Sequence, residues 1–190
     1  MRRVIGSLLV FGLILLTPGF SNPAGVAEAT QANNIRFTVL DVAFDARTFT
    51  INHVNPASSD LARGDTFVLN GKVFVGGTIA GGGTPASPGP FSPDAPGSIG
   101  RFICRGTSMF NGAQIAAGAA PFVATTQTFV LDNGNWLITE GLEGNASPIT
   151  RAVISGLGDF SGMRGEVQME LLGFNSTGME NYRFTFRLKK

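Results

Sequence analysis

An acid and a base stand inside a glycine-rich stretch, SGLGDFSGMRGE at residues 155–166, where Asp159 and Arg164 flank a predicted turn. A glycine-rich loop binds phosphate when a helix follows it directly, because the N-terminus of that helix supplies amide donors and a favourable dipole. Here Gly165 is followed by EVQMEL, in which polar and apolar residues alternate as they do in a strand. The stretch is therefore predicted to be a hairpin connection and not a phosphate loop.

Two interpretations of Asp159 and Arg164 follow from that hairpin. In the first, they form an exposed salt bridge that fixes the turn and contributes at most about 1 kcal/mol. In the second, they lie at the mouth of a closed sheet, where they hold or protonate a polar group of a ligand. The residue types leave both interpretations open.

Asp41 is a third residue with chemical potential, because it shares one face of IRFTVLD with Ile35, Phe37 and Val39. A carboxylate on an apolar face is costly to bury unless it is paired, and otherwise its pKa rises. We therefore expect Asp41 either to pair with an arginine or to act as an acid in a cavity. The arginines considered as its partner are Arg101, Arg105 and Arg164.

Metal chemistry and a catalytic triad are not expected. The chain has one histidine, His53, and one cysteine, Cys104, which cannot supply the usual nitrogen and sulfur ligands, and no acidic cluster has calcium-loop spacing. His53 stands in a short predicted strand near a proline turn and is interpreted as a surface residue. No metal site is expected.

The elements that must position these residues are strands. Apolar and polar residues alternate clearly in 182–189 and 166–171, and the acidic face of 166–171 can lie opposite the basic face of 182–189 across an antiparallel pair. Weaker alternation occurs in 35–42, 48–54, 65–75, 99–110, 125–131, 135–142 and 149–155. These short strands, with turn signals such as Asp132-Asn-Gly134, predict an all-β sandwich or closed barrel. Residues 76–98 are rich in Gly and Pro and are predicted to be a mobile flap or disordered.

The N-terminal residues 1–29 are predicted to be a secretory signal peptide, followed by one domain at 30–190. Arg2 and Arg3 precede an uncharged, mostly apolar run at 4–16 that is too short to span a bilayer comfortably, and small residues follow it.

Without Arg2, Arg3 and Glu28 the remaining chain carries 12 basic and 12 acidic residues. That neutrality argues against nucleic acid or an anionic membrane as partner. With a single cysteine no intrachain disulfide forms, so stability is expected to come from the core and from oligomerisation.

Three segments resemble a known group of proteins. GDFSGMRG at 158–165 is similar to the "GTGDF…ARG" turn of plant dirigent proteins, and GDFSGMRGEVQMELLGF with YRFTFRLK is similar to the end of allene oxide cyclases. GDTFVLNGKVFVGG at 64–77 resembles a strand of the same cyclases. The resemblance implies an eight-stranded antiparallel β-barrel of calycin type, assembled as a homotrimer, with a largely apolar cavity open at one end. It also implies chemistry without a metal or cofactor.

The resemblance also implies site residues. Asp159 and Arg164 match the acid and the arginine of the dirigent turn, Asp41 lies near the acid of the first strand, and Asn70 matches a cyclase asparagine. The tyrosine that the family places on its central strand, near Thr107 or Ser108, is missing here. The expected catalytic residues are Asp41, Asp159 and Arg164, and the expected ligand-binding residues are Asn70, Arg105 and Ser108.

Three functional hypotheses follow. The first is a secreted, cofactor-free barrel that binds a small apolar organic intermediate and steers its cyclisation or coupling, as an isomerase-like or dirigent-type protein does. The second is a secreted, lipocalin-like binding protein without turnover. The third is a structural protein whose barrel is filled by its own side chains, which a Phe-, Met- and Leu-rich interior would favour.

Overall fold

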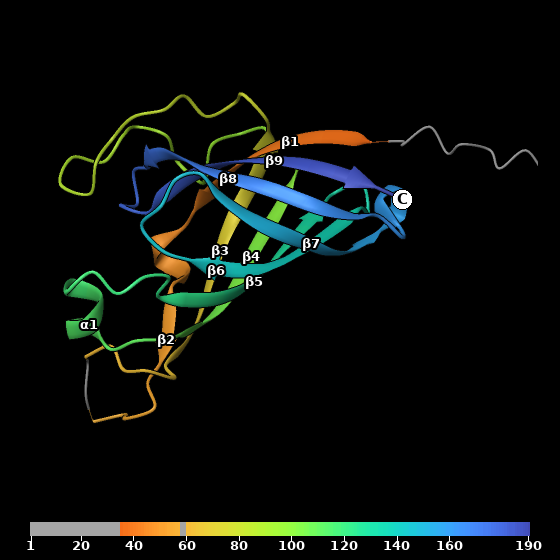
Figure 1. Ribbon diagram of the computed structural model, residues 1–190. Coiled ribbons are helices and arrows are strands. Elements are labelled where there is room, and N and C mark those ends of the chain that lie inside the picture. Colours follow the sequence, from red (N-terminus) through yellow and green to blue (C-terminus); the bar gives the residue numbers. More distant parts are fainter. Residues whose placement is uncertain (1–34, 58–59) are drawn as a thin grey trace, which may run out of the picture. The chain divides into compact units, whose positions relative to one another are not determined.

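The computed structural model describes residues 35–57 and 60–190 (Figure 1). The predicted signal peptide, residues 1–29, lies outside the described residues. Eight antiparallel strands close into a barrel because β1 pairs with β9 on one side and with β3 on the other. The barrel strands are β1 (Arg36–Phe44), β3 (Thr66–Val75), β4 (Gly100–Ser108), β5 (Val123–Leu131), β6 (Trp136–Glu143), β7 (Ile149–Leu157), β8 (Arg164–Phe174) and β9 (Glu180–Lys189).

A ninth strand, β2 (Thr50–Asn52), pairs with β3 and adds a short ribbon beside the barrel. The predicted all-β barrel is thereby confirmed. The predicted charge register is also confirmed, since Glu166 lies opposite Arg187, and Glu170 opposite Arg183, between β8 and β9. These cross-strand pairs hold the register of the two strands.

Helix is scarce in the described part of the chain. It comprises the 3-10 turns η1 (Ala46–Thr48) and η2 (Gly158–Phe160) and the short α1 (Gly112–Ala116). The helix α1 begins at a reciprocal cap, in which the side chains of Asn111 and Gln114 each accept from the other residue's backbone amide. Within residues 35–57 and 60–190, no helix has the length and apolar character needed to cross a bilayer.

The two ends of the barrel differ in how their interiors are filled. We call the end with the β5–β6 and β7–β8 connections the closed end, and the end with β2 and α1 the open end (Figure 1). Towards the closed end, the ring of Phe129 lies 4.9 Å from Phe184 and 5.1 Å from both Phe102 and Phe186, and all four side chains are fully buried. This part of the interior is a packed aromatic core, as the third hypothesis supposed for the whole barrel.

Residues 76–98 pack along the outer wall of the barrel. Ile79 is 2 % exposed and lies against Ala43 and Phe74, while the ring of Phe91 is 5.2 Å from that of Phe74. Gly82 forms a backbone bridge with Gly173 of β8. The composition indicated a mobile flap or a disordered segment, but these anchoring contacts involve backbone groups and distant strands, which composition does not reveal.

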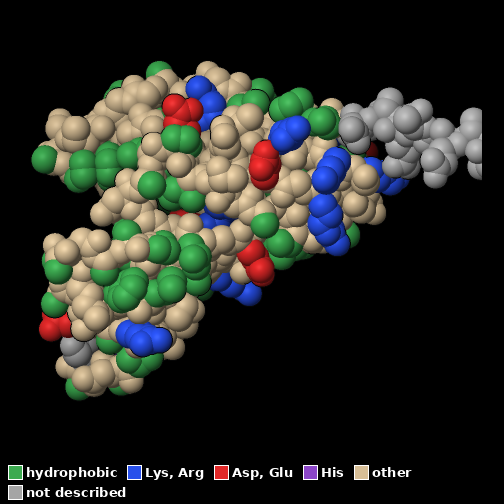
Figure 2. Space-filling view, in the orientation of Figure 1, with side chains coloured by type: hydrophobic (Ala, Val, Ile, Leu, Met, Phe, Trp, Pro, Cys, Tyr) green, Lys and Arg blue, Asp and Glu red, His purple; other side chains and the backbone are tan. Residues whose placement is uncertain are grey.

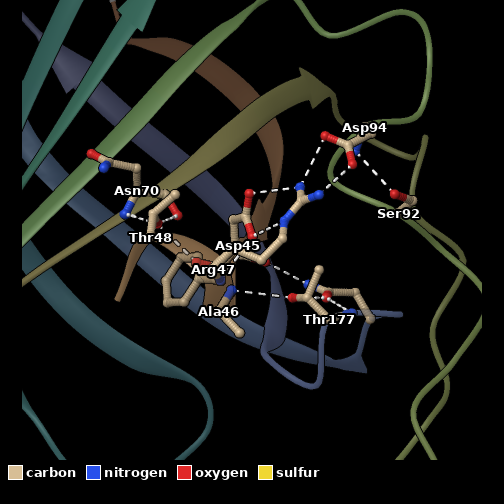
Figure 3. Close-up of polar contacts among 10 residues, drawn as sticks. Asp45, Ala46, Arg47, Thr48, Asn70, Ser92, Asp94 and Thr177 are labelled. Atoms are coloured by element: carbon tan, nitrogen blue, oxygen red, sulfur yellow. Dashed lines mark hydrogen bonds and ion pairs between the residues drawn. The ribbon is translucent and has the colours of Figure 1, made fainter. Parts of the chain in front are cut away.

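A polar cluster holds the far part of this loop to η1 (Figure 3). Arg47 forms ion pairs with Asp45 and with Asp94, each at 2.8 Å. The hydrogen bonds from Arg47 lower the pKa of both carboxyl groups. In the same cluster the backbone amide of Asn70 donates to Oγ1 of Thr48 at 2.9 Å. Residues 76–98 are therefore linked to both the wall and the open end.

Candidate ligand-binding site

The open end of the barrel contains a cavity of about 570 Å³. Cavities of roughly 300–1,000 Å³ accommodate small organic ligands. Most of the lining is apolar, and it comes from the interior faces of the strands and from the loops around α1 and β2, including Phe44, Phe67, Leu69, Ile115, Met169 and Tyr182. Figure 2 shows hydrophobic side chains gathered on the part of the surface that carries α1 and β2.

Glycine makes room for one of the large rings in this lining. A Cβ at Gly106 of β4 would overlap the ring of Phe67, which lies on the neighbouring strand β3. The absence of a side chain at Gly106 lets the Phe67 ring lie flat against the barrel wall. The cavity is therefore bounded on this side by an aromatic face.

Glu143, the last residue of β6, supplies a charged group to the cavity lining. Its Oε1 accepts hydrogen bonds from Nη1 of Arg151 at 2.6 Å, from Nε2 of Gln127 at 3.0 Å, and from the hydroxyl of Thr125. Among the described residues, all hydrogen bonds to this side chain end on Oε1. Oε2 is therefore the carboxylate oxygen that accepts no hydrogen bond from the described residues.

Arg151 lies beside Glu143 inside the barrel, and its side chain is 0 % exposed, compared with 16 % for Glu143. Its Nη2 donates to the backbone oxygen of Thr125 at 3.0 Å, and its Nε donates to Oγ1 of Thr139 at 3.3 Å. Burial lowers the pKa of the guanidinium, and the charge of Glu143 opposes that shift. Arginine nevertheless remains charged in proteins. The pairing thus fixes the position of the Glu143 carboxylate.

A second carboxyl group, that of Glu180, lines the same cavity from the start of β9. Burial raises the pKa of Glu180, and the charge of Glu143 adds to the increase. Glu143 has a cationic partner, whereas Glu180 is in an environment that favours its protonated form. Two carboxyl groups whose surroundings differ in this way are suited to opposite roles in proton transfer.

Tyr182 and Cys104 complete the chemically distinctive part of the lining. The ring of Tyr182 lies 5.1 Å from that of Phe44, and burial raises the pKa of its hydroxyl. This hydroxyl is therefore a hydrogen-bond donor. Burial also raises the pKa of the Cys104 thiol, so Cys104 is a neutral part of the wall. In the described ranges, no group of three His, Cys, Asp or Glu side chains is placed to hold a metal ion.

The structure places Asp41 on the outside of the barrel. Its Oδ1 accepts from Nε of Arg183 at 2.8 Å, and its Oδ2 accepts from the backbone amides of Gly77 and Ile79, each at 2.9 Å. The side chain is fully buried, but beneath the 76–98 loop and not in the cavity. Its partner is thus Arg183 and none of the three arginines considered from the sequence.

The structure places Asp159 and Arg164 at the closed end, away from the cavity. The carboxylate of Asp159 accepts from Nδ2 of Asn135 at 2.8 Å, and Nη1 of Arg164 donates to the backbone oxygen of Met163 at 3.2 Å. Both residues are exposed, and the structure contains no ion pair between them. The two residues therefore do not lie at the mouth of the cavity, the position considered for them from the sequence.

Of the three expected ligand-binding residues, only Ser108 lines the cavity. Its hydroxyl donates to the backbone oxygen of Phe110 at 2.7 Å, and its role in binding stays a prediction. Arg105 is exposed on the outer face of β4, and Asn70 lies at an outer groove beside η1. Neither is among the residues that line the cavity.

Sequence reasoning missed Glu143, Arg151, Glu180 and Tyr182 as a group. A signal for Arg151 was present, because it shares strand parity with Ile149 and Val153 and so places a charge on an apolar face. The other residues had no local signal that they meet in space.

Comparison with solved structures identifies the fold. Two pterocarpan synthase dirigent proteins superpose with TM-scores of 0.58 and 0.56 at 13 % and 14 % sequence identity, covering 83 % and 90 % of this chain and 96 % and 98 % of theirs. A pyocyanin demethylase gives a TM-score of 0.50 at 15 % identity, covering 80 % of this chain and 100 % of its own. No protein-family model and no curated protein matches the sequence. The fold is that of the dirigent and allene oxide cyclase barrels, which confirms the resemblance at the level of fold.

Proposed function

We propose that this chain binds a small, largely apolar organic molecule at the open end of the barrel. It steers the cyclisation of that molecule by acid–base chemistry, or steers its coupling by fixing its orientation when a separate oxidase supplies the reactive form. The observation that carries the proposal is the presence of two carboxyl groups in unlike environments, Glu143 and Glu180, in one apolar cavity of about 570 Å³. The proteins of similar fold are named for a pterocarpan synthase and for a pyocyanin demethylase, and both names refer to chemistry on small organic molecules.

In this proposal each polar residue has a defined role. Oε2 of Glu143 accepts a proton from the bound molecule, and Arg151 acts as a positioning residue that holds the carboxylate in place. Glu180 donates a proton to another atom of the molecule, so that the molecule neither gains nor loses protons overall, and exchange with solvent restores both carboxyl groups. Positioned general acids and bases typically accelerate such steps by about 10²–10⁴-fold. The rings of Phe44, Phe67 and Tyr182 restrict the orientation of the apolar part.

Binding without turnover is the second candidate, and the cavity serves it equally well. The feature that favours chemistry is the buried pairing of Arg151 with Glu143, because a carrier of apolar molecules has no need for a desolvated charge. The packed closed end agrees with a structural barrel, but it does not account for the cavity at the open end.

Binding can be tested with Nile red, a neutral apolar dye whose fluorescence rises in apolar surroundings. Leu171 lines the cavity and is 38 % exposed, whereas Leu157 is 52 % exposed and lies away from the cavity. Leu171→Trp is expected to fill the cavity mouth and abolish the fluorescence increase, and the matched control Leu157→Trp is expected to retain it. Equal dye binding by both variants, with circular dichroism showing both folded, would contradict binding in this cavity.

We also propose that the protein is exported and assembles as a homotrimer. Export is supported by the composition of residues 1–29. The trimer is supported by the resemblance and by exposed apolar side chains on the barrel wall, such as Phe37, which is 65 % exposed, and Val75, which is 57 % exposed. Burial of such a patch stabilises an assembly. Light scattering is expected to give three times the subunit mass, and a concentration-independent monomer would contradict the trimer.

A further inference from the structure

The charged side chains that line the cavity are both acidic. They are Glu143 from β6 and Glu180 from β9, and no Lys, Arg or His is among the described residues of the lining. The polar, uncharged part of the lining includes Ser108, Asn145 and Ser147. A ligand that enters the open end therefore meets carboxyl groups and no accessible cation.

The cation that pairs with Glu143 is not available to a ligand. The guanidinium of Arg151 is 0 % exposed and is already hydrogen-bonded to Glu143, Thr139 and the backbone of Thr125. It neutralises part of the charge of Glu143, but it offers no donor to the cavity. Oε2 of Glu143 and the carboxyl group of Glu180 remain as acceptors for positive charge.

The aromatic part of the lining also favours a positively charged ligand. Phe44, Phe67 and Tyr182 present aromatic rings to the cavity, and the faces of such rings attract cations through their quadrupole. A carboxylate entering the same space would meet two acidic side chains where screening by water is weak, which raises the cost of like charges. Rings and carboxyl groups together form a receptor for a cation.

We propose that the cavity selects an organic cation, such as a protonated amine carried on an apolar skeleton, and rejects a carboxylate of the same skeleton. This inference rests on the proposed function, because it assigns the substrate class of that same site. The ammonium group contacts Glu143 and, when Glu180 is ionised, the carboxylate of Glu180 as well. The protonated form of Glu180, which donates a proton in the proposed function, binds the cation less tightly. The apolar skeleton occupies the space between the aromatic rings.

Affinity for such a cation depends on pH through Glu180. The titratable groups that interact with this carboxyl group are Glu143 from β6 and Tyr182 from its own strand. Cys104 from β4 lines the same cavity, and Arg151 is paired with Glu143. Burial raises the pKa of Glu180, so a proton occupies it to a higher pH than usual. A bound cation favours the ionised carboxylate, and affinity for the amine therefore increases as the pH rises and Glu180 loses its proton.

The direct test is calorimetry with three probes that share one ring system, namely 1-naphthylmethylamine, 1-naphthalenemethanol and 1-naphthoate. At pH 7 they carry a positive, a zero and a negative charge. The amine is expected to bind at least about tenfold more tightly than the acid, a ratio that corresponds to about 1.4 kcal/mol. If the alcohol binds as tightly as the amine, or if the acid binds best, charge selection is overturned while binding in the cavity stands. If none of the three binds, the proposed function fails and this inference fails with it.

Substitutions of the two cavity glutamates test whether their carboxyl groups cause the charge selection. Glu180→Gln is expected to reduce amine affinity at least about fivefold, which corresponds to about 1 kcal/mol, and to remove its pH dependence. It is expected to weaken alcohol binding much less, because the glutamine side chain can still accept from a hydroxyl. The matched control is Glu140→Gln, because Glu140 is exposed on the outer face of β6. Glu143→Gln provides a second variant, and it is expected to weaken amine binding more than alcohol binding. Equal losses for both probes in both cavity variants would overturn the proposal.

Discussion

Arg151 and Glu143 form an ion pair inside the barrel, with Nη1 of the arginine 2.6 Å from Oε1 of the glutamate. The two partners differ in their surroundings, because the arginine is fully buried in the barrel interior while the glutamate borders the cavity. Removing Glu143 and removing Arg151 therefore have different consequences for stability, because only Glu143 can be hydrated from the cavity when its partner is absent. The ion pair therefore connects the packed interior of the barrel to the lining of the cavity.

Unfolding measurements should reveal this difference. Glu143→Leu leaves Arg151 as an unpaired buried charge, and breaking a buried pair in this way costs about 3–5 kcal/mol. Arg151→Met leaves a carboxylate that water in the cavity can solvate, so a smaller loss of about 1–3 kcal/mol is expected. The double variant should recover most of the loss. Urea unfolding that gives equal losses for the two single variants, and a simple sum for the double variant, would contradict this account.

Asp41 is predicted to stabilise the fold and not to contact the ligand. Asp41→Asn weakens the pairing with Arg183 and the two bonds to the 76–98 loop, and we expect a loss of about 1–3 kcal/mol in the free energy of unfolding. Amide exchange at Gly77 and Ile79 should become faster, and Nile red affinity should stay the same. Weaker dye binding without a change in stability would instead support the cavity role predicted from the sequence.

A pH dependence is expected from Asp65, whose carboxylate accepts from the backbone amides of Ala62 and Val54 and pairs with His53 at 2.8 Å. These bonds, that from Ala62 foremost, lower the pKa of Asp65. Its stabilising contribution is therefore present above the unfolded-state pKa of about 3.9 and is lost as the pH falls through the lower folded-state pKa. The difference in unfolding free energy between wild type and Asp65→Asn should shrink from about pH 5 to about pH 2. A constant difference over that range would disprove the assignment.

Export is predicted to remove the N-terminal segment. The small residues Gly25, Ala27 and Ala29 predict a mature chain that begins at Glu28 or Thr30. N-terminal sequencing of protein secreted by the producing organism checks this prediction. Retention of Met1 on that protein would refute it.

The fold was accessible from the sequence because its signals are local. Alternation in 166–171 and 182–189, together with the Asn-Gly turn at 133–134, predicted strands and hairpins that the structure contains. The opposed charges of Glu166 and Arg187 also predicted the register. Period-two patterns of this kind depend only on neighbouring residues.

The candidate site was not accessible in the same way. Alternation groups Asp41 with Phe37 and Val39 on one face, but it does not say which face points inward, and Phe37 proves to be 65 % exposed. Glu143 and Glu180 are 37 positions apart and meet only because the open end brings the β6 and β9 termini to one cavity. Convergence of this kind depends on closure of the barrel and has no local pattern.

A crystal structure of the complex with 1-naphthalenemethanol would test the central claim most directly. The account predicts the naphthalene ring between Phe44, Phe67 and Tyr182, with the hydroxyl of the probe within hydrogen-bond distance of Oε2 of Glu143 or of the carboxyl group of Glu180. A probe found only on the outer wall of the barrel, with the cavity at the open end free of it, would contradict the account.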